Sequence, residues 1–360
     1  MPSKGFLVIL RYMKPDFKSM LDNLVEEEVK AVKQSTFHKH SRTMFVDGLN
    51  LFFRNFATLN YINQDGVHIG GLAGFLRSLG TLIKVIQPTS VYLIFDGMGS
   101  STNRKNLIPE YKSGRGVTRM TNWDIFDSIE DEDEAKYGQI ARLVHYLKCL
   151  PVTVISIDKA EADDVIAYLA KKVTQSTPQS KAFIVSSDKD YLQLVNDEIT
   201  VYRPTEKDFY TYATVVDKMG VLPENFILLK TLTGDNSDSV KGIKGMGAKT
   251  AVKLFPQLKT EPITFNDLIT IAEGKYKDNV LYSRLIFEEE QLRKTHKIMD
   301  LHNPILDEGQ IELINELSSA PTPKLRPGEF LKMYHEDGLG HILKAPNYWI
   351  AETFSTVKGF

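Results

Sequence analysis

Short runs of apolar residues recur along the chain, and the first four of them end at or just before an acidic residue. These runs cover residues 43–46, 91–95, 152–157 and 181–187, and they are rich in Val, Ile and Phe. Runs of this length bounded by polar residues or glycine are typical of buried parallel strands. A shorter run at 199–202 follows, so the pattern predicts five strands.

Amphipathic helical patterns lie between these runs. Residues 70–86, 137–150 and 160–172 place apolar side chains at the spacing of one helix face. Strands that alternate with helices predict an α/β fold, in which a mostly parallel central sheet is flanked by helices. After residue 202 the pattern becomes helical.

The same pattern divides the chain into four parts. We expect an N-terminal extension over 1–42, a core over 43–213, a helical region over 214–300 and a C-terminal helical tail over 301–360. An insertion at about 97–136 interrupts the core. Unstructured loops of that length are uncommon and are often functional lids or arches.

Composition narrows the class of protein. The chain has 360 residues, 42% hydrophobic and 25% charged, with 44 basic and 46 acidic side chains. This near balance predicts no strong overall attraction to nucleic acid, so any such binding must come from local charge. Cys149 is the single cysteine, which excludes an intrachain disulfide and a Cys-based zinc site. We therefore expect a reducing, cytoplasmic location, and no transmembrane helix because no 18-residue apolar stretch exists.

Acidic residues gather where the predicted strands end. The nine candidates are Asp47, Asp96, Glu161, Asp163, Asp164, Asp188, Asp190, Asp235 and Asp238. A lone Asp after a strand usually caps a helix or turn. Nine carboxylates at one sheet edge would repel each other unless cations lay among them. Oxygen ligands without His or Cys suit two Mg²⁺ ions, with Mn²⁺ as a substitute, which is a standard arrangement for cutting phosphodiesters.

A glycine-rich turn follows the last two acids. Its glycines permit tight backbone geometry between two short helices, and its exposed amides can hold a phosphate. This is the sequence form of a helix-hairpin-helix, although a plain helix–helix turn is the alternative. The candidate DNA-contacting residues here are Gly242, Lys244, Gly245, Gly247, Lys249 and Thr250.

The insertion carries a second basic element. Its cations are Arg104, Lys105, Lys112, Arg115 and Arg119, with Tyr111 and Trp123 interleaved. Cations beside a metal site could clamp the scissile phosphate, and Tyr111 could stack on a base. A solvated surface is the alternative. The acidic run at 130–134 reads as a solvated turn.

In these segments the chain resembles the structure-specific 5′-nucleases, which include flap endonucleases, the 5′-nuclease domain of bacterial DNA polymerase I and phage 5′-exonucleases. The matching segments are Phe45-Val-Asp-Gly-Leu-Asn50, Phe95-Asp-Gly97, Pro109-Glu-Tyr-Lys-Ser-Gly-Arg115, Glu161-Ala-Asp-Asp164, Ser187-Asp-Lys-Asp-Tyr-Leu192 and the stretch from Gly234 to Ala251. The stretches at 123–127 and 157–164 look most like the ribonuclease H enzymes of T-even phages.

The resemblance implies a PIN-like sheet, a helical arch, a helix-three-turn-helix, and Mg²⁺-dependent removal of 5′ ends, including RNA primers of the lagging strand. It assigns Asp47, Asp96, Glu161 and Asp163 to one metal, and Asp188, Asp190, Asp235 and Asp238 to the other, with Asp164 beside them. It places Lys112, Arg115 and Arg104 as catalytic cations of the arch. Asn106 departs from the family, which often has Glu there, and this leaves the alignment of Arg104 open by one residue.

Two other functions are weighed against this one. A PIN-type ribonuclease shares the acidic edge but would lack the turn at 242–251 and the insertion. A catalytically inactive DNA-binding accessory protein would have lost several of the nine acids.

The expected partners are duplex DNA with a 5′ flap or 5′ end and RNA/DNA hybrids. The tail is a candidate site for a single-stranded-DNA-binding protein or a sliding clamp, and we expect a monomer.

Overall fold

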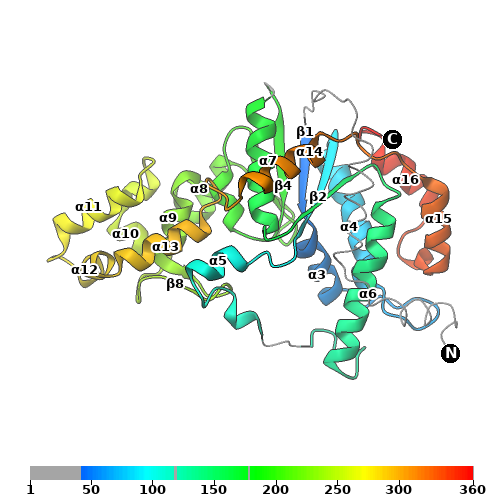
Figure 1. Ribbon diagram of the computed structural model, residues 1–360, viewed down its shortest axis with the longest axis horizontal. Coiled ribbons are helices and arrows are strands. Elements are labelled where there is room, and N and C mark those ends of the chain that lie inside the picture. The colour runs from blue at the N-terminus through cyan, green and yellow to red at the C-terminus, as the bar shows by residue number, and fades with distance from the viewer. Residues whose placement is uncertain (1–41, 117–119, 177–178, 360) are drawn as a thin grey trace.

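A six-stranded sheet lies at the centre of the computed structural model, which describes residues 42–116, 120–176 and 179–359. The extension predicted for 1–42 falls outside these residues except for Arg42, and so does Arg119. The strands follow the order β3-β2-β1-β4-β5-β6 (Figure 1). They are β1 (Arg42–Asp47), β2 (Ser90–Asp96), β3 (Thr153–Ile157), β4 (Lys181–Val185), β5 (Ile199–Arg203) and β6 (Asp208–Tyr210).

The predicted mostly parallel α/β sheet is confirmed. The pairs β1–β2, β1–β4, β2–β3 and β4–β5 are parallel, and only β6 runs antiparallel to its neighbour β5. The strand order reverses between β1 and β4, because β2 and β3 lie on one side of β1 and the later strands on the other. Ligand sites of open α/β sheets lie at the carboxyl ends of the strands at such a switch point.

Alternate residues of each strand enter two separate cores. In β1, Phe45 packs into one core, whereas Met44 and Val46 pack into the other. The first core is covered by α7 (Ala162–Ser176) and α14 (Glu308–Ser319). The second is covered by α3 (Gly48–Thr58), α4 (Gly70–Ile86), α6 (Ile129–Leu147), α15 (Pro327–Glu336) and α16 (Pro346–Phe354).

The insertion is largely helical at both ends. It contains α5 (Thr102–Leu107) and the 3₁₀ turn η1 (Ser113–Gly116), and it returns through α6, which begins at Ile129. The acidic run is therefore the first turns of a helix and not a turn in solvent. The Ser128 side chain caps this helix by accepting from the Asp131 amide, and acids near a helix N-terminus are stabilised by its dipole.

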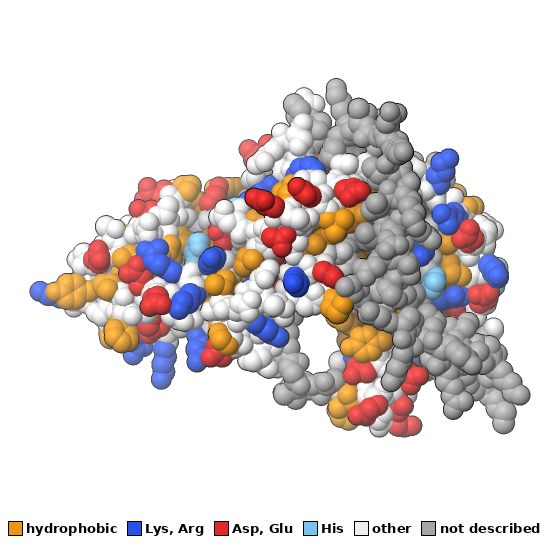
Figure 2. Space-filling view, viewed as in Figure 1, with side chains coloured by type: hydrophobic (Ala, Val, Ile, Leu, Met, Phe, Trp, Pro, Cys, Tyr) orange, Lys and Arg blue, Asp and Glu red, His pale blue; other side chains and the backbone are white. Residues whose placement is uncertain are grey.

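The helical region extends away from the sheet, to the left in Figure 1. It contains α8 (Tyr212–Met219), η3 (Pro223–Asn225), α9 (Phe226–Thr233), β7 (Gly234–Asp235), β8 (Val240–Lys241), α10 (Ala248–Leu254), η4 (Pro256–Lys259), α11 (Phe265–Lys275), α12 (Val280–Phe287) and α13 (Glu289–Met299). Lys and Arg side chains project from its lower edge in Figure 2.

The C-terminal helices are built into both cores. Leu317 of α14 is fully buried in the first core, and Phe330 and Phe354 of α15 and α16 are fully buried in the second. The Asp337 carboxylate also accepts hydrogen bonds from Arg142 (2.7 Å) and Tyr146 (2.8 Å) of α6. The predicted tail is thus part of the globule. Among the described residues, no helix is long and apolar enough to cross a membrane.

Candidate active site

Acidic side chains meet at the carboxyl ends of the strands. Asp47 is the last residue of β1 and Asp96 the last of β2, and Asp188 follows β4. The Asp47 carboxylate accepts from the Asn50 amide (3.0 Å), and Asp96 accepts from the Ala162 amide at the start of α7 (2.7 Å). Both carboxylates therefore cap helices, and these bonds fix where they point.

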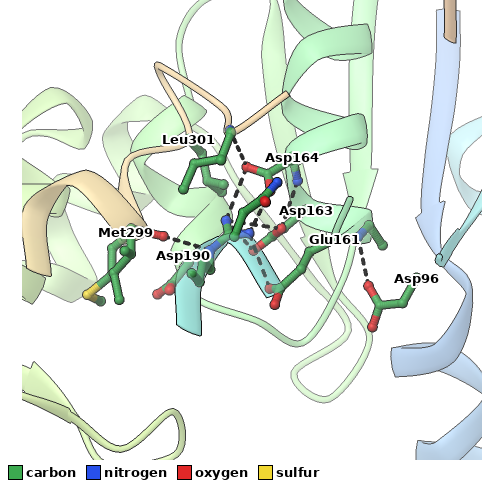
Figure 3. A network of polar contacts seen from close by, with 12 residues as sticks. Asp96, Glu161, Asp163, Asp164, Asp190, Met299 and Leu301 are labelled. Atoms are coloured by element: carbon green, nitrogen blue, oxygen red, sulfur yellow. Dashed lines mark hydrogen bonds and ion pairs between the residues drawn. The ribbon is translucent and has the colours of Figure 1, made fainter. Parts of the chain in front are cut away.

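These ends surround a pocket of about 440 Å³, which we call the carboxylate pocket. Seven of the nine predicted acids line it: Asp47, Asp96, Glu161, Asp163, Asp188, Asp190 and Asp238. Figure 3 shows Glu161, Asp163 and Asp164 joined in one polar network at the start of α7, where Asp96 accepts a backbone hydrogen bond. The structure thus brings together acids that are separated by up to 191 positions in the sequence, from Asp47 to Asp238.

The other two acids are turned toward cations of the protein. Asp164 is buried, accepts from both terminal nitrogens of Arg104 (2.5 and 3.1 Å), and also accepts from the Ile305 amide. Asp235 pairs with Lys230, whose ammonium also lies 2.7 Å from Asp190. Neither Asp164 nor Asp235 lines the carboxylate pocket.

The acids of the pocket disfavour one another's charge. Burial, assisted by repulsion from Asp96, Asp188 and Asp163, raises the pKa of Asp47 to about 7. Burial is also the first cause that raises the pKa values of Asp96 and Asp188. Such a cluster favours the entry of positive charge, which stabilises the ionised carboxylates.

The donor set suits hydrated divalent cations. The pocket is lined by carboxylates and lacks His and Cys, and the buried Oε1 of Glu161 has no hydrogen-bond partner. Among the described residues, no three acidic, His or Cys side chains are grouped so that they could hold an ion directly. Mg²⁺ usually keeps several waters and takes one or two carboxylates, and the pocket has room for such waters.

Two residues of the insertion reach Glu161. The Lys112 ammonium lies 2.7 Å from Glu161 Oε2, and the Tyr111 hydroxyl donates to the same oxygen (2.9 Å). The Tyr111 ring is only 2% exposed, which contradicts the expectation that it stacks on a base. Its hydroxyl instead helps to orient Glu161.

Arg104 lines the carboxylate pocket from a buried position. Its side chain is 3% exposed and donates to Asp164, Asp163 and the Ile298 carbonyl. Through these bonds the guanidinium links Asp163 and Asp164 to the C-terminal end of α13. Arg115 lies on η1, and its side chain is outside the described residues.

The glycine-rich turn lies beside a second pocket, the hairpin pocket, which is lined by Gly242–Gly247 and by Glu110, Ser113 and Ser239. Buried Ile243 and Met246 fasten the turn to the core, whereas Lys244 and Lys249 are exposed and Thr250 is half-buried. The turn is followed by α10, but the short strand β8, and not the expected helix, directly precedes it; α9 lies before the β7–β8 pair.

The glycines of this turn differ in their roles. Gly245 has a left-handed backbone (φ +88°), which favours glycine. A Cβ on Gly242 would lie 2.3 Å from the Gly234 nitrogen, so close backbone packing requires glycine there. Gly247 has φ −87° and open space around its Cα, so its own backbone conformation does not require glycine.

Several pocket residues were not predicted. Asn50, Phe53 and Arg54 of α3 line the carboxylate pocket, and the Asn50 side chain accepts from the Ser187 amide (3.1 Å). Their position directly after Asp47 was a usable signal, since a helix that starts at a strand end faces the site. Met299 and Leu301 also line the pocket, but nothing in their local sequence indicates it.

The switch-point pocket of carboxylates, the insertion and the hairpin are together typical of nucleases that cut phosphodiester bonds. The chain belongs to the 5′-3′ exonuclease family: the model of the 5′-3′ exonuclease N-terminal resolvase-like domain matches residues 42–220. The 5′-3′ exonuclease of Bacillus subtilis is 32% identical over 245 residues, which cover 66% of this chain and 77% of that protein. The 5′-3′ exonuclease of Aquifex aeolicus is 33% identical over 216 residues, which cover 59% and 69%. DNA polymerase I of Bacillus subtilis is 32% identical over 247 residues, 67% of this chain but only 26% of that longer protein.

Solved structures share the fold at lower identity. The 5′-exonuclease of T5 with bound zinc has a TM-score of 0.57 at 20% identity and covers 85% of this chain and 99% of its own. Human GEN1 in complex with Holliday junction DNA has a TM-score of 0.52 at 18% identity, covering 87% and 71%. The PIN-like architecture predicted from the sequence is thereby confirmed.

Proposed function

We propose that this chain is a Mg²⁺-dependent, structure-specific 5′-nuclease. It removes 5′ ends and flaps from duplex DNA and from RNA/DNA hybrids, including RNA primers of the lagging strand in the cytoplasm of a phage-infected cell. The observation that carries the proposal is the carboxylate pocket at the switch point, where seven acids face one cavity beside Lys112.

The residues of the pocket divide into two halves around the proposed ions. Asp47, Asp96, Glu161 and Asp163 would hold one hydrated ion, in part through its waters, and Asp188, Asp190 and Asp238 the other. When bound, two divalent ions activate a water and neutralise the leaving 3′-oxygen, and Mn²⁺ can substitute for Mg²⁺. Asp164 and Asp235 act from outside the pocket by holding Arg104 and Lys230 in place.

Cations of the insertion act on the phosphate. Lys112 is 18% exposed, and its ammonium lies at the pocket, so it can donate to a non-bridging phosphate oxygen. Arg115, three positions further on in η1, is proposed to assist it. Arg104, which also lines the pocket, contributes by fixing Asp163 and Asp164 in place.

The hairpin is proposed to hold the duplex by its sugar-phosphate backbone. Gly242, Gly245 and Gly247 expose backbone near Lys244 and Lys249. Backbone contacts fix position without reading sequence. The pair β7–β8 joins this turn to Asp238 of the carboxylate pocket, so the hairpin sets a fixed distance to the cut.

Relatives and neighbours support DNA as the partner. A flap endonuclease of T5 has been crystallised as a pseudo-enzyme-product complex with DNA and metal ions, at a TM-score of 0.56 and 19% identity. We propose a monomer. Because the C-terminal helices are packed into the cores, a single-stranded-DNA-binding protein or sliding clamp would have to use their outer faces.

A substrate panel tests this function. The purified chain is incubated with 5′-labelled flap, nicked and RNA-primed duplexes and with single-stranded RNA, in Mg²⁺, in Mn²⁺ and in chelator. We expect metal-dependent release of 5′ products from the duplexes and none in chelator. Preferential cutting of single-stranded RNA would favour the PIN-type ribonuclease, and DNA binding without cutting would favour the inactive accessory protein.

A further inference from the structure

The insertion and the hairpin meet at two residues with unusual backbones. Lys112 has φ 56° and Ser239 has φ 57°, and neither is a glycine. The Lys112 amide donates to the Asp238 carbonyl (2.7 Å), and the Gly114 amide donates to Ser239 Oγ (3.0 Å). Left-handed backbone at such residues persists only where surrounding contacts impose it, and it clusters at functional sites.

These contacts lie between the two pockets. Lys112 and Asp238 line the carboxylate pocket, whereas Ser239 lines the hairpin pocket together with Glu110 and Ser113 of the insertion. The hairpin pocket is therefore completed by the same turn of the insertion that carries Lys112. A DNA backbone bound in the hairpin pocket would contact both this turn of the insertion and Ser239.

The turn also fixes where the Lys112 ammonium lies. A side chain leaves a left-handed residue in a direction that a right-handed or extended backbone would not allow, and here it reaches Glu161 at 2.7 Å. If the contacts to residues 238 and 239 were lost, Lys112 could relax to an ordinary backbone and its ammonium would leave the pocket.

We propose that Ser239 is a positioning residue, which couples occupation of the hairpin pocket by a duplex backbone to the placement of Lys112 in the carboxylate pocket. This rests on the proposed function. Ser239 touches neither the cleaved phosphate nor an ion; it holds the insertion turn through Gly114.

The first test replaces the serine in two ways. Ser239→Gly removes the Oγ acceptor but accepts the left-handed backbone without strain, so the fold should be kept. Ser239→Asn also tolerates that backbone and retains a side-chain acceptor. We expect Ser239→Gly to lower the single-turnover rate on a 5′ flap about three- to tenfold, because the loss of one hydrogen bond has an effect of this size. The Kd for the duplex should stay within about twofold of the wild-type value. Ser239→Asn should recover most of the rate.

Gln87→Gly is the matched control. Gln87 also has a left-handed backbone (φ 53°), but it ends α4 just before β2 begins, at the opposite edge of the sheet from the pocket. Its replacement relieves the same strain and should leave the rate unchanged. An equal loss of rate in Gln87→Gly and Ser239→Gly would overturn the proposal.

A double-mutant cycle tests the path of the effect. If Ser239 acts through Lys112, then Ser239→Gly should cost little further rate in a Lys112→Ala background. Additive losses would overturn the proposal, as would a full rate in Ser239→Gly alone. Absence of divalent-metal-dependent cutting by the wild type would instead overturn the proposed function, so the two failures are distinguishable.

Discussion

Lys112 reaches the carboxylate pocket from the insertion, and its ammonium contacts Glu161. We expect Lys112→Ala to lower the single-turnover rate on a flap by about 10²-fold or more while the Kd changes by only a few-fold, because a cation that meets developing charge stabilises the transition state. Lys105→Ala is the control, since Lys105 is exposed on α5 and should affect mainly affinity at low salt. If both variants lose rate and affinity in the same proportion, the insertion acts only as an electrostatic surface and Lys112 has no catalytic role.

At the scale of single residues, the sequence predicted which acids gather at the sheet edge, but not which cations they pair with. Nine acids were predicted because strand ends of a parallel sheet share one edge, and seven of them line the pocket. Whether a carboxylate faces the pocket or a buried cation depends on side-chain direction. Asp164 turns to Arg104, which comes from 60 positions earlier, and no local pattern encodes that pairing.

Among the elements, the hairpin offers a matched pair of glycines. Gly242→Ala should destabilise the fold, because its Cβ would lie 2.3 Å from the backbone of Gly234. Gly247→Val should leave the melting temperature nearly unchanged, since this residue has ordinary φ and open surroundings. If a phosphate approaches this turn, Gly247→Val will weaken duplex binding and flatten its salt dependence. Thermal unfolding and Kd measured at several salt concentrations separate the two effects, and an unchanged salt slope for Gly247→Val would argue against phosphate capture here.

A buried carboxylate anchors the returning limb of the insertion. Glu132 is 1% exposed and accepts from the amides of Thr121 (2.9 Å) and Asn122 (3.1 Å) and from the Asn122 side chain. Glu132→Gln replaces one acceptor oxygen by a donor, so we expect the free energy of unfolding to fall by about 1–3 kcal/mol. Urea denaturation measures this loss. Glu134→Gln, an exposed neighbour on the same helix, should be neutral, and equal stability of both variants would refute the anchor.

Element prediction from the sequence succeeded where periodicity is strong and failed where long-range contacts decide. The five predicted strands and α4 follow their apolar patterns, whereas the short strands β6, β7 and β8 were not predicted. The start of α6 was missed by eight residues, at 129 rather than 137, because its first turns are acidic. The sequence showed charge there, but not that Glu132 is folded inward against Thr121.

On the scale of the whole molecule, the C-terminal helices pack back onto the central sheet. The segment after residue 300 looked like a separate tail, yet α14 completes one core and α15 and α16 complete the other. Such packing joins residues far apart in sequence, for example Asp337 with Arg142 of α6, and amphipathic spacing alone cannot specify the partner. The carboxylate pocket is likewise assembled from most of the chain's length, from Asp47 at the end of β1 to Leu301 after α13.

The most direct test of the central claim compares cutting and binding in one variant. Asp188→Asn removes a carboxylate of the pocket and touches nothing in the hairpin. Because burial raises the pKa of Asp188, loss of its charge should leave the metal-free protein at least as stable as the wild type. Single-turnover cleavage of a 5′ flap in Mg²⁺, with the Kd for the same DNA measured in parallel, should show cleavage abolished and binding within a few-fold of wild type. Full cleavage by Asp188→Asn would contradict the assignment of this pocket as the metal-dependent active site.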